Sequence, residues 1–108
     1  TFHMNIEENN IGDAIRYAGE YLKGFHTGES NRAAPGRGHL DWDEIFKALS
    51  DIKYTGRIVS EPFVMPGGEV GDAVKLWRNL VSENTEAVID NEANFLLEFE
   101  KNMIRKYA

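Results

Sequence analysis

The sequence contains no cysteine, and it has no long apolar run. The absence of cysteine excludes disulfide bonds and thiolate metal sites, so any bound metal must be held by histidine, aspartate or glutamate. No stretch approaches the roughly 20 apolar residues that cross a bilayer, and no basic start followed by an apolar block indicates a signal peptide. We therefore expect a cytoplasmic protein that makes no contact with a membrane.

Positive charge is also scarce. The 12 lysines and arginines are outnumbered by 18 aspartates and glutamates, which gives a formal net charge of −6. This balance argues against a nucleic acid as partner, because its phosphates attract basic surfaces, and it leaves small neutral or cationic ligands open. With 42% hydrophobic and 11% aromatic residues, the 108 residues suffice for one ordinary globular domain.

Apolar residues at helical spacing mark two helices in the first half of the chain. The first helix follows Asn9 or Asn10 as its N-cap, and the second follows Asp41, which forms a capping box with Glu44. Trp42 belongs to the buried stripe of the second helix. The stripe of the first helix consists of Ile11, Ala14, Ile15, Ala18 and Leu22.

Two further helices are predicted in the second half. The spacing of apolar residues predicts a third helix over 70–81, with Trp77 in its apolar stripe, and a fourth helix over 83–107. We expect Trp77, like Trp42, to lie in the core.

Three short segments are typical of strands. Residues 1–5 alternate between apolar and polar, residues 22–26 form a short apolar segment, and residues 57–61 are β-branched and stopped by Pro62. Strands that alternate with helices indicate parallel pairing through right-handed crossovers. Because three such strands leave one face of the sheet uncovered, we expect the closing units of a (β/α)₈ barrel of about 250 residues, with further residues upstream of Thr1.

Polar side chains gather where the predicted strands end. In a (β/α)₈ barrel the active site lies at these carboxyl ends, where the sequence places His3, His26 and Glu61. Neighbouring strands are about 4.8 Å apart, so His26 and Glu61 can share one ligand, and their side chains suit Mn²⁺, Mg²⁺ or Co²⁺. A lone histidine is more often a hydrogen-bonded structural residue. A carboxylate that ends an apolar strand carries a desolvation cost unless something binds it.

A glycine-rich connection joins His26 to the second helix. Arg32 in this connection is either a solvated loop residue or a ligand-binding group, and its position shortly after His26 favours the second reading. Glu29 is expected either to pair with a loop arginine or to fix the loop. His39 is expected to serve the local structure.

Four motifs together resemble the ketose 3-epimerase family, which includes D-tagatose 3-epimerase and D-psicose (D-allulose) 3-epimerase. The motifs are HMNIEE (3–8), FHTGESNR (25–32), PGRGHLDWDEIF (35–46) and SEPF (60–63). The resemblance covers essentially the whole chain. It implies an α/β fold in which residues 1–108 form a single segment, the C-terminal three βα units of a xylose isomerase-like TIM barrel plus a C-terminal helix.

The resemblance also implies roles for individual residues. In that family two glutamates, an aspartate and a histidine bind a divalent ion, commonly manganese, and His26 and Glu61 match two of these four ligands. The family's aspartate would stand immediately before Thr1, and its first glutamate belongs to an earlier strand. His3 and Arg32 match residues that contact the substrate. Ser30 stands where relatives often have asparagine, which bears on substrate preference.

The activity implied by the resemblance is epimerisation at C3 of free ketoses of the D-tagatose, D-psicose and D-fructose type through a cis-enediolate. It implies Glu61 as a catalytic carboxylate and Mn²⁺ as cofactor, with Mg²⁺ or Co²⁺ as alternatives. We expect a homo-oligomer, because unpaired strand edges and an apolar sheet face favour association of copies. The 108 residues alone are expected to be inactive. One alternative is another isomerase of the same superfamily, such as an aldose–ketose or hydroxypyruvate isomerase. The other is a non-catalytic fragment that associates with itself.

Overall fold

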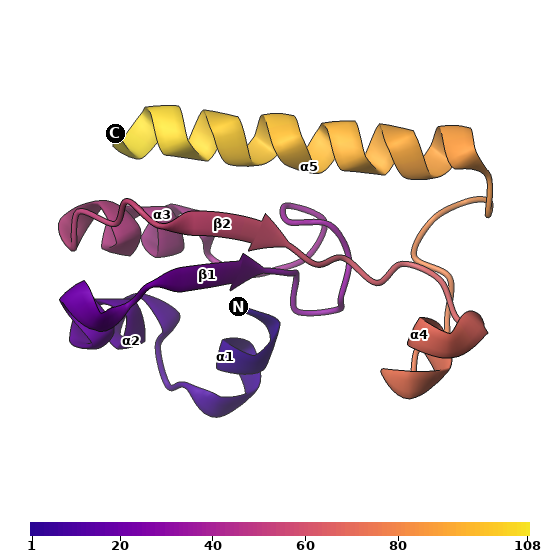
Figure 1. Cartoon of the computed structure of the whole chain (residues 1–108), viewed down its shortest axis with the longest axis horizontal. Helices are drawn as coiled ribbons and strands as arrows, with labels where there is room; N and C mark the ends of the chain where they lie inside the picture. Colours follow the sequence, from indigo (N-terminus) through magenta and orange to yellow (C-terminus); the bar gives the residue numbers. More distant parts are fainter.

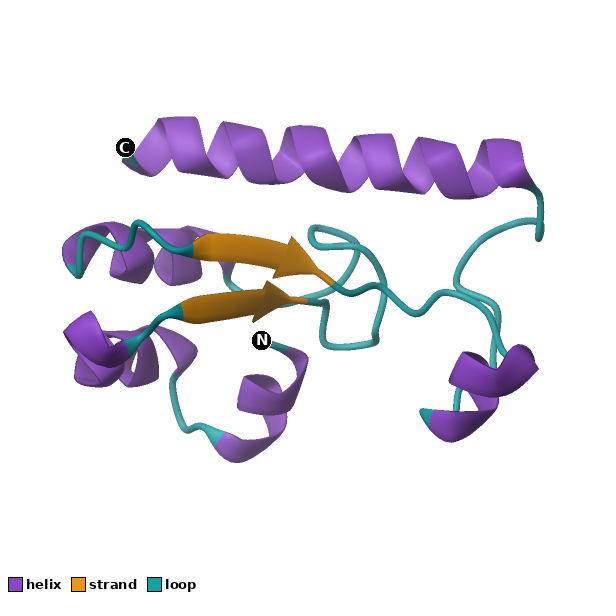
Figure 2. Ribbon diagram, in the orientation of Figure 1, coloured by secondary structure: helices purple, strands orange, loops and turns teal.

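The computed structural model describes all residues, 1–108, and it contains one small parallel sheet surrounded by helices (Figure 1). The sheet consists of β1 (Gly24–Thr27) and β2 (Arg57–Ser60), paired in parallel so that His26 lies opposite Val59. Figure 2 shows that the remaining regular structure is helical. The helices are α1 (Phe2–Glu7), α2 (Ile11–Ala18), the 3₁₀ helix η1 (Gly19–Tyr21), α3 (Trp42–Asp51), α4 (Gly68–Ala73) and α5 (Glu86–Tyr107).

The two faces of the sheet differ in burial. Phe25 and Thr27 of β1 are buried, and Ile58 and Ser60 of β2 are partly buried, whereas the alternate residues of both strands are exposed. One face is therefore covered and the other is bare, as the strand period of two requires. The covered face packs into a core formed with α2, α3 and α5, composed of Ile15, Phe25, Trp42, Ile45, Phe46, Ala48, Leu49 and Met103.

Side-chain caps define the starts of α2 and α3, as predicted. The side chain of Asn10 accepts a hydrogen bond from the backbone N–H of Asp13 at 2.8 Å, and the side chain of Asp41 accepts one from that of Glu44 at 3.0 Å. Each cap satisfies a backbone donor that would otherwise have no partner in the first helical turn.

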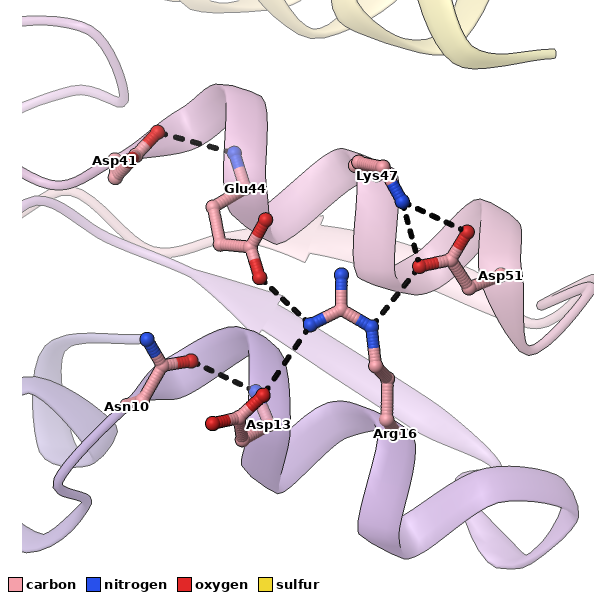
Figure 3. Close-up of polar contacts among 7 residues, drawn as sticks. All are labelled: Asn10, Asp13, Arg16, Asp41, Glu44, Lys47 and Asp51. Carbon is pink, nitrogen blue, oxygen red and sulfur yellow. Dashed lines mark hydrogen bonds and ion pairs between the residues drawn. The ribbon is translucent and has the colours of Figure 1, made fainter.

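Arg16 connects α2 to α3 (Figure 3). Its guanidinium lies 2.6 Å from the carboxylate of Glu44 and 2.9 Å from that of Asp51, and 3.4 Å from Asp13 on its own helix. These pairs raise the pKa of Arg16 above its ordinary value and lower that of Glu44. The pKa of Asp51 is lowered first by Lys47, whose ammonium lies 3.0 Å away, and then by Arg16. The two helices are therefore joined by polar contacts at their surface as well as by the core beneath.

The predicted strand over residues 1–5 is wrong. Residues from Phe2 onward form α1, whose first turn is closed by a hydrogen bond from the backbone N–H of Asn5 to the carbonyl of Thr1 at 2.9 Å. Alternation over five residues is too short to exclude a helix, and a helix satisfies its backbone groups without a neighbouring strand. The sheet accordingly has two strands instead of three.

The predicted third helix ends early, at Ala73 instead of residue 81. Lys75 has a φ of 59°, a left-handed conformation that a helix cannot continue through. Trp77 follows outside the helix and is 81% exposed, so its predicted core position is also wrong. The fourth predicted helix is confirmed as α5, which begins after Thr85 as its N-cap. No helix combines the length and the apolar character that crossing a bilayer requires.

Candidate metal and substrate site

His26 and Glu61 lie together at the carboxyl end of the sheet, as the sequence predicted. His26 projects from the bare face of β1, and Glu61 directly follows β2, where its backbone N–H donates to the carbonyl of Thr27 at 2.9 Å. The Nδ1 atom of His26 is 2.8 Å from the Oε1 atom of Glu61. Both side chains are about half exposed, so a ligand from solution can reach them.

His3 and Arg32 belong to the same site. A cavity of about 40 Å³ is lined by the four predicted site residues, His3, His26, Arg32 and Glu61, together with Thr1, Phe2, Thr27, Gly28 and Phe63. α1 is held at the end of β1 because the hydroxyl of Thr1 donates to the carbonyl of Gly28 at 2.6 Å. The correction of residues 1–5 from strand to helix therefore leaves His3 at the predicted edge of the sheet.

Arg32 is held by aromatic rings and by its backbone. Its guanidinium carbon lies 3.9 Å from the centre of the Phe2 ring and 5.3 Å from that of Phe63. Its φ of 70° is left-handed, and its carbonyl accepts a hydrogen bond from the backbone N–H of Phe63 at 2.8 Å. A non-glycine residue in this region costs about 1 to 3 kcal/mol, a strain that often accompanies function. Arg32 is therefore fixed beside the cavity.

Glu29 fixes the loop that carries Arg32. Its side chain is fully buried and accepts hydrogen bonds from Trp42 Nε1 at 2.5 Å and from the backbone N–H groups of Ser30, Gly36 and Leu40. Burial by itself raises the pKa of this carboxyl, but the four donors outweigh it and hold the pKa below its usual value. Of the two roles expected for Glu29, fixing the loop is confirmed and pairing with an arginine is not observed.

Two glycines allow the loop to close around Glu29. A Cβ atom on Gly38 would come within contact distance of the Glu29 carboxylate, and Gly36 has a φ of 89°. The loop also brings the hydroxyl of Ser30 to 3.0 Å from Nδ1 of His39, the local structural role predicted for that histidine.

The side chains of His26 and Glu61 provide part of the ligand set that a divalent cation requires. His26 Nδ1 and Glu61 Oε1 contact each other directly at 2.8 Å. Two ligand atoms bound at about 2.1 Å and at a right angle are about 3 Å apart, so a cation could replace this contact with little change in their separation. An imidazole with a carboxylate suits Mn²⁺ and related ions. The structure contains no group of three or more potential metal-binding side chains, so His26 and Glu61 are the two side chains at this site that could bind a cation.

Phe2 and Phe63, which hold the guanidinium of Arg32, were not predicted as site residues from the sequence. Each lies close to a predicted site residue, since Phe2 precedes His3 and Phe63 follows Glu61 by two positions. The signal in the sequence that could have identified them was their position within two residues of a polar site candidate.

Comparison with known proteins gives consistent results. The family model described as xylose isomerase-like TIM barrel matches residues 1–96. The chain is 52% identical over 104 residues to the D-psicose 3-epimerase of Ruminiclostridium cellulolyticum, covering 96% of this chain and 36% of that protein. It is 54% identical over 99 residues to the D-psicose 3-epimerase of Enterocloster bolteae, covering 92% of this chain and 33% of that protein.

A solved structure is similar as well. The D-psicose 3-epimerase of Clostridium cellulolyticum H10 with D-tagatose superposes with a TM-score of 0.91 at 51% identity, over 95% of this chain and 36% of that one. The chain thus spans about one third of the length of the relatives that it matches.

Proposed function

The chain belongs to the xylose isomerase-like TIM barrel family, and on that basis we propose that it forms the C-terminal part of a metal-dependent ketose 3-epimerase. The substrates are free ketoses of the D-psicose, D-tagatose and D-fructose type, since similar proteins are named D-psicose 3-epimerase and have been solved with D-tagatose or in the presence of D-fructose. The cofactor is Mn²⁺, with Mg²⁺ or Co²⁺ as alternatives. The full-length protein acts in the cytoplasm as a homo-oligomer.

One observation carries the proposal. The structure brings His3, His26, Arg32 and Glu61, which come from three separate segments of the chain, to one cavity at the carboxyl ends of parallel strands. Active sites of (β/α)₈ barrels lie at this edge. His26 and Glu61 would hold the cation, and Arg32 and His3 lie where they can donate hydrogen bonds to substrate oxygens.

The reaction requires a proton to leave C3, next to the C2 carbonyl, and to return on the opposite face. Glu61 takes or gives the proton on one face, and a carboxylate from another part of the full-length protein serves the other face. Loss of the C3 proton gives a cis-enediolate, and protonation of the opposite face gives the epimer without net oxidation. Arg32 and His3 stabilise the negative charge that develops on the oxygens. A bound divalent ion would supply Lewis acidity.

Glu61→Gln tests the catalytic carboxylate. The change removes the base and a ligand charge at nearly constant volume, so we expect turnover by the full-length protein to fall by at least about 10²-fold while the fold is kept. Epimer formation is measured by chromatography and the fold by circular dichroism. Glu98→Gln, an exposed glutamate on α5, is the matched control. Activity near the parent level would remove Glu61 from its role.

Product analysis distinguishes the proposal from its nearest rival. The full-length protein, supplied with Mn²⁺ and D-fructose or D-psicose, should form the C3 epimer, and chelation should abolish this activity. An aldose as main product would instead indicate an aldose–ketose isomerase. The isolated 108 residues should show no turnover, because they supply two metal ligands and one proton-transferring carboxylate.

A further inference from the structure

Glu100 is a buried acidic residue that the proposed reaction does not use. It lies on the core-facing side of α5, between Phe99 and Met103 of the hydrophobic cluster, and is 8% exposed. A carboxylate in such a position costs free energy unless its oxygens are hydrogen-bonded, and an apolar residue would fill the space without that cost. Its presence therefore calls for a polar role.

The Glu100 carboxylate binds both strands of the sheet at once. Its Oε1 atom accepts from the hydroxyl of Thr27 in β1 at 2.6 Å and from the hydroxyl of Ser60 in β2 at 2.7 Å. The two hydroxyl oxygens are themselves 2.7 Å apart. Thr27 and Ser60 are direct partners in the register of the sheet. Glu100 thus joins the last pair of residues in the two strands from the covered side.

This pair lies directly beneath the candidate metal ligands. His26 precedes Thr27 and faces the bare side of β1, and Glu61 follows Ser60. The separation of the Thr27 and Ser60 backbones sets the separation of the two positions from which the ligands project. The strands have only four residues each, and besides these contacts their ends are joined by the hydrogen bond from the Glu61 N–H to the Thr27 carbonyl.

We propose that Glu100 is a positioning residue for the metal site, acting through Thr27 and Ser60 to hold His26 and Glu61 at the separation a cation requires. The proposal rests on the proposed function, because the site that Glu100 positions is the metal site named there. Groups behind metal ligands typically change metal affinity 10- to 100-fold when removed.

The test compares Mn²⁺ affinity among variants of the full-length protein by calorimetric titration, well below the melting temperature. Glu100→Leu should weaken Mn²⁺ binding about 10-fold or more, and Glu100→Gln, which keeps an acceptor oxygen, should weaken it less. Glu98→Leu makes the same change on the exposed side of α5 and should leave affinity unchanged. If Glu100 served stability alone, its variants would melt at a lower temperature, but their Mn²⁺ affinities would not follow this order.

A triple variant guards against a loss of folding. Thr27→Val, Ser60→Ala and Glu100→Leu together replace every polar member of the contact by apolar groups of similar shape, a change that is often neutral for stability. The triple variant should fold and still bind Mn²⁺ about 10-fold more weakly than the parent. Parental affinity in the folded triple variant would overturn the proposal.

Failure of the proposed function gives a different result. If the parent binds no Mn²⁺, or if His26→Ala leaves Mn²⁺ binding unchanged, the metal site itself is refuted. Whether Glu100 holds His26 and Glu61 together, apart from any metal, is then judged from crystal structures of the parent and the triple variant. An increase in the separation of His26 Nδ1 and Glu61 Oε1 supports it, and an unchanged separation overturns it.

Discussion

At the scale of single residues, Arg32 is held in place by its neighbours and by its backbone. Its left-handed backbone and the rings of Phe2 and Phe63 restrict where the guanidinium can point. A group that is already ordered loses less conformational entropy when it binds. The ring contacts set Arg32 apart, because the exposed residues Lys53 and Lys75 also have left-handed φ values, 54° and 59°.

Arg32→Ala in the full-length protein should lower kcat/KM about 10- to 100-fold, the range expected for one charged hydrogen bond, and should leave bound metal unchanged. Arg37→Ala is the control, because Arg37 lies in the same loop but pairs with Glu92 and stacks on Phe95. Steady-state kinetics and metal analysis provide the measurements. Equal metal loss in Arg32→Ala and Glu61→Gln would contradict the separate roles of the two residues.

Glu29 should make stability depend on pH. Its folded pKa lies below the ordinary value of 4.5, so its ionised form stabilises the fold above that pH, and this contribution is lost as the pH falls through the folded pKa. We expect Glu29→Gln to melt at a lower temperature than the parent at pH 7, with the difference shrinking as the pH falls below about 4. Glu98→Gln should show no such convergence, and a pH-independent difference for Glu29→Gln would refute this account.

At the scale of elements, the N-caps of α2 and α3 are contacts within the first turn of each helix, and both helices also contribute residues to the core. Asp41→Ala should lower the free energy of unfolding of the full-length protein by about 1 kcal/mol, because the N–H of Glu44 loses its acceptor. Asp41→Asn keeps a capping oxygen and should cost a few tenths of that. Urea denaturation measures both, and equal losses would show that charge, not capping, is what Asp41 contributes.

Elements whose signals are local could be predicted from the sequence. Asp41 was recognised as a cap, and Asn10 as one of two candidates with Asn9, because a cap and its partner are three residues apart. The end of the third predicted helix could not be predicted from such a local signal. Val70 and Trp77 are exposed, so the apolar stripe has no packing surface within this chain that would sustain a helix.

The residues of the candidate site were predicted from the sequence, but the contacts that hold them in place were not. His26 and Glu61 end parallel strands, and their meeting follows from topology alone. The contacts of Glu100 with Thr27 and Ser60 join residues 73 and 40 positions apart in the sequence. No local pattern encodes such contacts, because they depend on how α5 lies across the sheet.

At the scale of the whole molecule, much apolar surface is unpartnered. The bare face carries Val59, and both strands have an unpaired edge. A groove of about 340 Å³ beside β2 is lined mainly by apolar residues of β2, α3 and α5 and of the segments that follow them, among them Phe46, Leu49, Tyr54, Ile58, Ile104 and Tyr107. Open edges and apolar faces favour association with other chains.

The isolated 108-residue chain should therefore self-associate at high concentration, as multi-angle light scattering would measure. Val59→Lys places a charge on the bare face and should reduce association, because a lysine there resists burial. Tyr17→Lys changes an exposed residue of α2 and serves as control. A well-folded monomer at all concentrations would contradict the prediction and with it the need for covering partners.

The alternation of faces along the strands constrains how this sequence can change length in evolution. Inserting or deleting one residue within β1 would exchange His26 with Thr27 between the two faces, removing the proposed metal ligand and the Glu100 partner in one event. Descendant sequences should therefore keep the strand lengths fixed. Insertions and deletions should accumulate instead between α4 and α5, over residues 74–85, which carry neither regular structure nor a predicted site residue.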